Sequence, residues 1–379
     1  MGQVAKDNIE IGVVLQGGGA LGAYEFGAMI ALLELMDKID VPGRTVRLTA
    51  VTGVSIGAIN AACVVGAENR ADARKRLRAL WSDLSLEAPS YWGAAASHNL
   101  AFFGVPGFYT PRRDIWNFFS WTNFYDTDPM LGTLKKHVDF ALLNASKTSL
   151  VVTAVDVCSG ELIRFRNHPR ENEKKIEIGP RHVLASGSLP PAFPPTGVRD
   201  GVNDGSYWDG GIVDNTPLGD AIDAFSGSDD VDRILIVMNL FRKKRAPPKN
   251  MIEVNDRLAE LRYGNRLRQD GENARTIDNL LQLIDDLAAA ASGGPLDPRL
   301  KERVLEAKRF KILGEITDID LADPVLMAEA DLSLESSDSG AFRDFSAAGI
   351  ERRRDAGHKI AKLKLQTLFE KHGLLPTSH

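Results

Sequence analysis

The stretch LQGGGALGAYEFG, residues 15–27, joins an apolar run to a helix-like segment. The apolar residues before its glycines predict a buried strand, and the spacing of apolar side chains over 23–36 predicts a helix. Gly17, Gly19 and Gly22 fit the G-x-G-x-x-G pattern, in which a tight turn and a helix N-terminus hold a pyrophosphate. The same backbone N–H groups can instead stabilise an oxyanion. The loop alone leaves both interpretations open.

Composition places the chain among ordinary globular proteins. It has 379 residues, of which 44% are hydrophobic and 26% charged, enough for one large domain with an appendage or for two domains. The formal net charge of −5 gives no indication of nucleic-acid binding. Cys63 and Cys158 are too few for a disulfide framework, which fits a reducing compartment.

Targeting and membrane signals are weak. The first ten residues, MGQVAKDNIE, lack the apolar core of a secretory signal. The most membrane-like window, residues 48–66, contains several polar residues and glycines, so it fits a buried strand–turn–helix better than a membrane span. We therefore expect a cytoplasmic protein whose only membrane contact would be peripheral.

Strand-like and helix-like segments alternate along the chain. Expected strands lie at 9–16, 46–53, 150–156, 161–166, 233–240 and 310–316. Expected helices lie at 20–37, 56–65, 71–84, 180–188, 252–291 and 345–371. This order predicts an α/β fold with a central, mainly parallel sheet flanked by helices. The basic, proline-bearing stretch 241–249 is interpreted as a linker or exposed loop between a catalytic domain, 9–240, and a helix-rich C-terminal extension, 250–379.

A candidate nucleophile follows the second expected strand. The sequence TGVSIGA contains Gly53-x-Ser55-x-Gly57, between a predicted strand and a predicted helix. This is the context of a nucleophile elbow, in which the glycines make room for a tight turn that exposes the serine oxygen. A helix start rich in small residues is the alternative interpretation.

The serine needs a base, and two kinds are available. A Ser–Asp–His triad requires a histidine after Ser55, and His182 is the best of them, although its place at a helix start suits capping instead. Asp209 lies in SYWDGGIVDNTPL, where a glycine loop would fix its carboxylate. In a dry site an aspartate can take the serine proton directly. A plain turn is the alternative for this segment.

Four blocks, taken together, resemble the patatin-like phospholipases. They are GGGALGAYEFG (17–27), GVSIGA (53–58), ASGSLPPAFPP (185–195) and DGGIVDNTPL (209–218). The resemblance covers residues 9 to about 240 and implies a three-layer patatin-like fold and a lipid acyl hydrolase with a serine–aspartate dyad. It assigns Ser55 as nucleophile, Asp209 as its base, and Gly17, Gly18 and Gly19 to the oxyanion hole. The extension resembles the C-terminal part of some bacterial patatin-like proteins, from which no function carries over.

The resemblance also decides between the two interpretations of the glycine loop. A dinucleotide fold would have an acid at the end of the second strand to hold the ribose, but Gly53-Val54-Ser55 stand there. We therefore expect an oxyanion hole, no cofactor and no metal, and a lipid or other acyl ester as substrate. A storage polyester, a glyceride or a thioester is the alternative substrate, and a non-catalytic lipid-binding protein is the alternative function.

Three surface features stay open at this level. Residues 91–125 contain 12 of the 27 aromatic residues, which fits either a cap or entrance lining for acyl chains, touching the lipid interface, or an ordinary core. The basic residues 242–249 would suit anionic headgroups or a solvated loop. The long helical segment after 250 would suit a homo-oligomer surface, a lid, or packing on its own domain.

Overall fold

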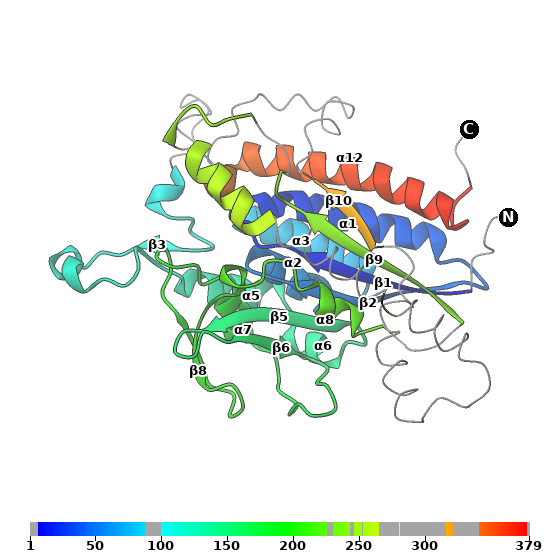
Figure 1. The fold of residues 1–379 in the computed structure, drawn as a ribbon, viewed down its shortest axis with the longest axis horizontal. Helices are drawn as coiled ribbons and strands as arrows, with labels where there is room; N and C mark the ends of the chain where they lie inside the picture. The colour runs from blue at the N-terminus through cyan, green and yellow to red at the C-terminus, as the bar shows by residue number, and fades with distance from the viewer. Residues whose placement is uncertain are drawn as a thin grey trace.

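A mixed β-sheet lies at the centre of the molecule (Figure 1). The computed structural model describes residues 7–87, 100–225, 230–242, 246–251, 253–264, 280, 316–321 and 341–376. In these residues the strand order is β10-β9-β1-β2-β5-β8-β7, with β6 paired to β5. The strands are β1 Asn8–Leu15, β2 Thr45–Gly53, β5 Ser149–Asp156, β6 Leu162–Arg166, β7 Thr196–Val198, β8 Gly205–Asp209, β9 Val231–Asn239 and β10 Ile316–Asp320. The predicted α/β class is confirmed.

The parallel half of the sheet sets the position of the site. β10, β9, β1, β2 and β5 run parallel, whereas β6, β7 and β8 run antiparallel to their neighbours. β1 and β2 pair in register with Leu15 opposite Gly53. The turns that follow these two strands therefore start side by side, which is where parallel α/β folds place their ligands.

Helices cover both faces of the sheet. They are η1 Gly19–Leu21, α1 Gly22–Ile39, α2 Ile56–Val65, α3 Arg70–Asp83, α5 Asp128–His137, α6 Phe140–Ala145, α7 Pro180–Ser186, α8 Leu218–Ile222 and α12 Ala347–Lys371. β1 shows the two-residue period of a strand buried on both faces, since Val13 and Leu15 enter the main core with α1, α2, α3 and α12. Val14 enters a second, smaller core under α8.

The last helix packs along the first, so the end of the chain lies against its beginning (Figure 1). Glycines allow the close approach: a Cβ at Gly357 would lie 2.0 Å from the carbonyl oxygen of Tyr24, and one at Gly27 would lie 1.9 Å from that of Arg354. Within the described ranges, the run Gly19–Ile39 is long and apolar enough to cross a bilayer, but 89% of its apolar window is buried in the fold.

Most of the expected elements are present. The short antiparallel strands β7 and β8 and the helices α5, α6 and α8 are additional to the expected elements. β10 begins at Ile316, where the predicted strand 310–316 ends, and residues 310–315 lie outside the described part. Residues 253–264 of the predicted helix 252–291 are helical, while most of its remainder lies outside the described residues, as do 91–99 of the aromatic-rich stretch.

Candidate active site

Ser55 lies in a strained turn between β2 and α2. Its backbone has φ 55° and ψ −125°, and it is the one non-glycine residue with positive φ in the described ranges. Such a conformation costs roughly 1–3 kcal/mol and is typical of functional sites. The flanking glycines leave the room that the turn needs, because a Cβ at Gly53 would lie 2.5 Å from the Gly57 carbonyl oxygen. A Cβ at Gly57 would lie 2.6 Å from the Leu15 carbonyl oxygen.

Asp209 is the last residue of β8, and its carboxylate meets the Ser55 side chain. β8 pairs with β5, which in turn pairs with β2, so the antiparallel strand brings Asp209 back toward the end of β2. The carboxylate accepts hydrogen bonds from Ser55 and from the Gly211 N–H, the latter at 2.8 Å. Asp209 is only 2% exposed. Burial raises its pKa to about 7, and the two hydrogen bonds limit that rise.

The glycine-rich loop lies beside Ser55. A Cβ at Gly17 would lie 2.8 Å from the Cβ of Ser55. The Gly17 N–H donates to Asn215 Oδ1 at 3.0 Å, and Asn215 Nδ2 donates to the Gly17 carbonyl at 3.1 Å. Gly17 therefore fixes the loop with its amide, whereas Gly18 and Gly19 are partly exposed and Gly19 has φ +55°.

Two further polar residues hold the site, and sequence reasoning missed both. Asn215 ties the glycine loop to the segment after Asp209 through the paired bonds given above. Ser186, at the end of α7, accepts the Ser55 N–H at 2.9 Å. Both belong to the quoted blocks 185–195 and 209–218, but only the three-dimensional contacts separate them from neighbouring small polar residues.

The buried carboxyl group of Glu25 supports the start of the glycine-rich loop. Glu25, in the first turn of α1, accepts the Gln16 N–H at 2.6 Å and the Asn60 Nδ2 group at 3.2 Å. Trp81 in turn donates to Asn60 Oδ1 at 2.9 Å. Burial raises the pKa of Glu25 well above its ordinary value, against the two hydrogen bonds. The strand end before Gly17 is thus anchored to α1 and α2.

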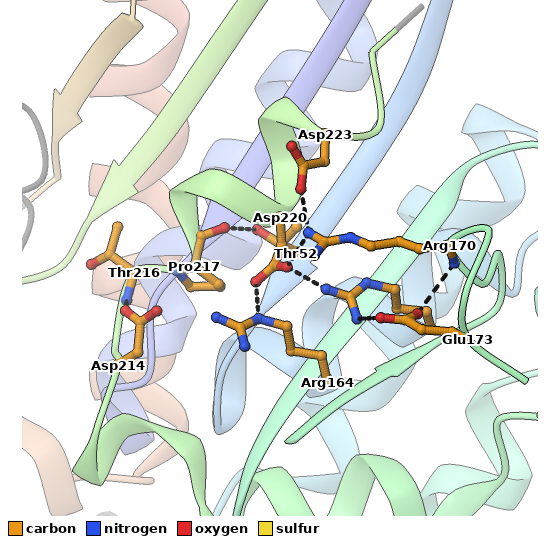
Figure 2. A network of polar contacts seen from close by, with 10 residues as sticks. Thr52, Arg164, Arg170, Glu173, Asp214, Thr216, Pro217, Asp220 and Asp223 are labelled. Atoms are coloured by element: carbon orange, nitrogen blue, oxygen red, sulfur yellow. Dashed lines mark hydrogen bonds and ion pairs between the residues drawn. The ribbon is translucent and has the colours of Figure 1, made fainter. Parts of the chain in front are cut away.

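An ionic cluster fixes the segment that follows Asn215 (Figure 2). Asp220 of α8 is buried. It forms an ion pair with Arg164 at 2.6 Å, and it also pairs with Arg166 and Arg170. At the start of the helix, Thr52 Oγ1 of β2 lies 3.4 Å from the Pro217 carbonyl oxygen. α8 is therefore held to β6 and β2, and the segment 209–217 runs between two fixed ends.

His182 is not placed as a catalytic base. Its Nδ1 accepts the Gly179 N–H at 2.8 Å, which caps α7, and its Nε2 lies 3.1 Å from Asp200 Oδ2. Both ring nitrogens are engaged away from Ser55. Within the described ranges, no group of three or more His, Cys, Asp or Glu side chains could hold a metal ion.

The C-terminal extension reaches the glycine loop. The Phe342 carbonyl oxygen of η6, Ala341–Arg343, would lie 2.6 Å from a Cβ at Gly19. The Phe342 ring stacks on the Phe241 ring at 5.7 Å between centroids. The ring of Tyr263 also packs against Phe241, at 5.8 Å between centroids. Burial raises the pKa of Tyr263, and the charge of Asp209 raises it further. Aromatic side chains from residues 250–379 thus pack on Phe241, and the backbone of Phe342 contacts Gly19 of the glycine loop.

A family model and a solved structure are similar to this chain. The family model described as patatin-like phospholipase matches residues 13–222, more than half of the chain. A solved structure, VipD from Legionella pneumophila, is similar at 14% identity with a TM-score of 0.39, over 96% of this chain and 68% of that one. No curated protein matches the sequence.

Proposed function

The chain belongs to the patatin-like phospholipase family, and we propose that it is a lipid acyl hydrolase working through a seryl acyl-enzyme. One observation carries the proposal: a serine in a strained strand–helix turn hydrogen-bonds to a buried aspartate whose pKa is raised to about 7. An aspartate with that pKa is ionised in part at neutral pH and is far more basic than one in water. The substrate class that the family implies is a lipid acyl ester.

Acylation would begin with proton transfer from Ser55 Oγ to the Asp209 carboxylate as Oγ attacks the ester carbonyl carbon. The carbonyl oxygen becomes an oxyanion, for which the Gly18 and Gly19 N–H groups are the proposed donors, because Gly17 donates to Asn215. The tetrahedral intermediate collapses, the ester C–O bond breaks, and the Asp209 carboxyl returns the proton to the leaving alkoxide. The acyl group remains on Ser55.

Deacylation would repeat these steps with water. Asp209 accepts a proton from a water molecule that attacks the acyl carbon, and the same two amides stabilise the second oxyanion. When this intermediate collapses, Ser55 Oγ leaves and takes back the proton from Asp209. The products are a free fatty acid and the regenerated dyad.

Labelling with a fluorophosphonate probe tests the proposal, because the probe reacts with an activated serine. We expect the purified chain to label, Ser55→Ala to lose all labelling, and Asp209→Asn to label at least about a hundredfold more slowly. His182→Ala is the matched control and should label if it folds, since His182 contacts Gly179 and Asp200 instead of Ser55. Labelling that survives in Ser55→Ala, or a folded wild-type chain that does not label, would contradict the proposal.

A further inference from the structure

An aromatic loop stands away from the body of the protein. We use this name for residues 112–124, which join the short strands β3 Thr110–Pro111 and β4 Tyr125–Asp126. Figure 1 shows this cyan segment projecting beyond the sheet and its helices. Its exposed apolar side chains are Ile115 (73%), Trp116 (86%), Phe118 (52%), Phe119 (102%) and Phe124 (50%). The core alternative from the sequence is therefore wrong for this part of the aromatic-rich stretch.

The loop holds its shape while these side chains face water. Arg112 forms an ion pair with Asp114 and lies 5.1 Å over the ring of Trp121. Trp121 Nε1 donates to the Asp114 carbonyl oxygen at 3.2 Å, which closes the 3₁₀ segment η4, Ile115–Ser120. The half-buried Trp121 thus fixes the residues at which the exposed tip begins, through its contacts with Arg112 and Asp114. Such a patch marks an interaction site, because solvated loops rarely present contiguous large apolar side chains.

The chemistry of the tip fits a lipid surface. Residues 115–125, IWNFFSWTNFY, contain no charged side chain, and Arg113 follows β3 at the exposed edge of the loop. Trp and Phe favour the boundary between headgroups and acyl chains, and an arginine beside them suits phosphate. The loop projects from the body of the protein (Figure 1), which allows separate side chains to enter a bilayer but buries little area against a folded protein.

The base of the loop is connected to the active site. The N–H groups of Phe124 and Tyr125 donate to the Ala192 carbonyl oxygen at 3.1 and 2.9 Å. Ala192 lies in the segment after α7 whose Ser188 carbonyl oxygen accepts the Asp209 N–H at 3.0 Å. A single short segment therefore touches the aromatic loop at one end and the dyad aspartate at the other. Docking of the loop on a membrane would therefore be linked to Asp209 through residues 188–192.

We propose that the aromatic loop inserts Trp116, Phe118 and Phe119 into the interface of a lipid bilayer and docks the active site on it. That the bilayer supplies the substrate rests on the proposed function, whereas binding of the loop to the bilayer requires no catalysis. Apolar insertion rather than charge supplies the affinity, so binding persists on zwitterionic lipid and in high salt.

Flotation with phosphatidylcholine vesicles tests docking, in the full-length Ser55→Ala background so that no lipid is hydrolysed. We expect the parent to bind in both 0.1 and 0.5 M NaCl, and Trp116→Ser with Phe119→Ser to lower the partition coefficient at least tenfold. The control is Leu363→Ser on α12, which removes an apolar side chain that is also exposed (50%) but lies outside the aromatic loop. This variant should bind like the parent. A parent that does not bind, a loop variant that binds equally, or binding lost at 0.5 M NaCl would overturn the proposal.

A second measurement separates docking from catalysis and from folding. With Ser55 intact, the loop variant should lose at least tenfold in hydrolysis of vesicle lipid and keep its kcat/KM for a short-chain ester below its micellar concentration. Its thermal midpoint should match that of the wild type, because both side chains are exposed; a drop of more than about 5 °C would reveal a packing role and overturn the proposal. Vesicle binding without any ester hydrolysis would contradict the proposed function and leave docking supported.

Discussion

At the scale of single residues, Asp209 sets the pH at which the proposed reaction runs. Its pKa is raised to about 7 by burial, so below pH 7 the carboxyl holds its proton and cannot accept that of Ser55. We expect kcat/KM for a soluble ester to rise about tenfold per pH unit up to about pH 7 and then to level off. Initial rates between pH 5 and 9 measure this, and the residual rate of Asp209→Asn should lack the step. A rate that stays flat from pH 5 to 7 would contradict this assignment.

Ser55 and Asp209 could be picked out from the sequence as a candidate pair, but the residues that hold them could not. Ser55 and Asp209 carry signals because glycines must flank a tight elbow and a fixed carboxylate, and the structure brings the two side chains together. Asn215 and Ser186 carry no such signal, since a small polar side chain in a loop has many possible partners. Glu25 is hidden for another reason: one carboxyl in an apolar helix predicts an exposed edge, whereas here it is fully buried.

At the scale of elements, the ionic cluster around Asp220 should hold α8 in place. Asp220 and Arg166 are both buried, so Asp220→Asn would leave the buried guanidinium of Arg166 with only the more exposed Glu173 as a charge partner. We expect this change to lower the free energy of unfolding by about 3 kcal/mol. Asp223→Asn is the matched control, because the Asp223–Arg170 pair is largely exposed and should contribute less than about 1 kcal/mol. Urea unfolding measures both; equal losses would show that burial of the cluster does not matter.

The same scale shows why some elements were predictable and others were not. The buried strands β1, β2, β5 and β9 are eight or nine residues long and apolar enough to be recognised. β7 and β8 have three and five residues and include glycine, serine and aspartate, which are typical of turns. They form strands because β8 pairs with β5 and β7 then pairs with β8, and this is tertiary information.

At the scale of the whole molecule, the end of the chain is joined to its beginning. The sequence predicted a C-terminal extension packed on the catalytic part, and that division of the chain stays a prediction. Within the described residues, β10 pairs with β9 and α12 packs along α1. η6, just before α12, lies over Gly19 of the proposed oxyanion loop. No pattern in 341–346 predicts this contact, because it depends on where α12 places the preceding residues.

Gly357→Ala tests whether this packing matters for stability and for the site. Alanine favours a helix over glycine by about 1 kcal/mol, but its Cβ would lie 2.0 Å from the Tyr24 backbone carbonyl oxygen. Backbone cannot turn aside as a side chain can, so we expect a net loss of about 1–3 kcal/mol in the free energy of unfolding. Gly132→Ala in α5 is the control, since no atom lies within 4 Å of its added Cβ, and it should leave stability unchanged or raise it.

The esterase rate of the same two variants then shows whether α12 only supports the fold or also shapes the proposed oxyanion loop. If α12 positions η6 on Gly19, a shift of α12 away from Tyr24 should move the Phe342 carbonyl and lower kcat for a soluble ester at 20 °C, where the variant remains folded. Gly132→Ala should keep the wild-type kcat. A Gly357→Ala chain that is less stable but fully active would confine α12 to structural support, because the proposed oxyanion loop would then keep its geometry without the contact.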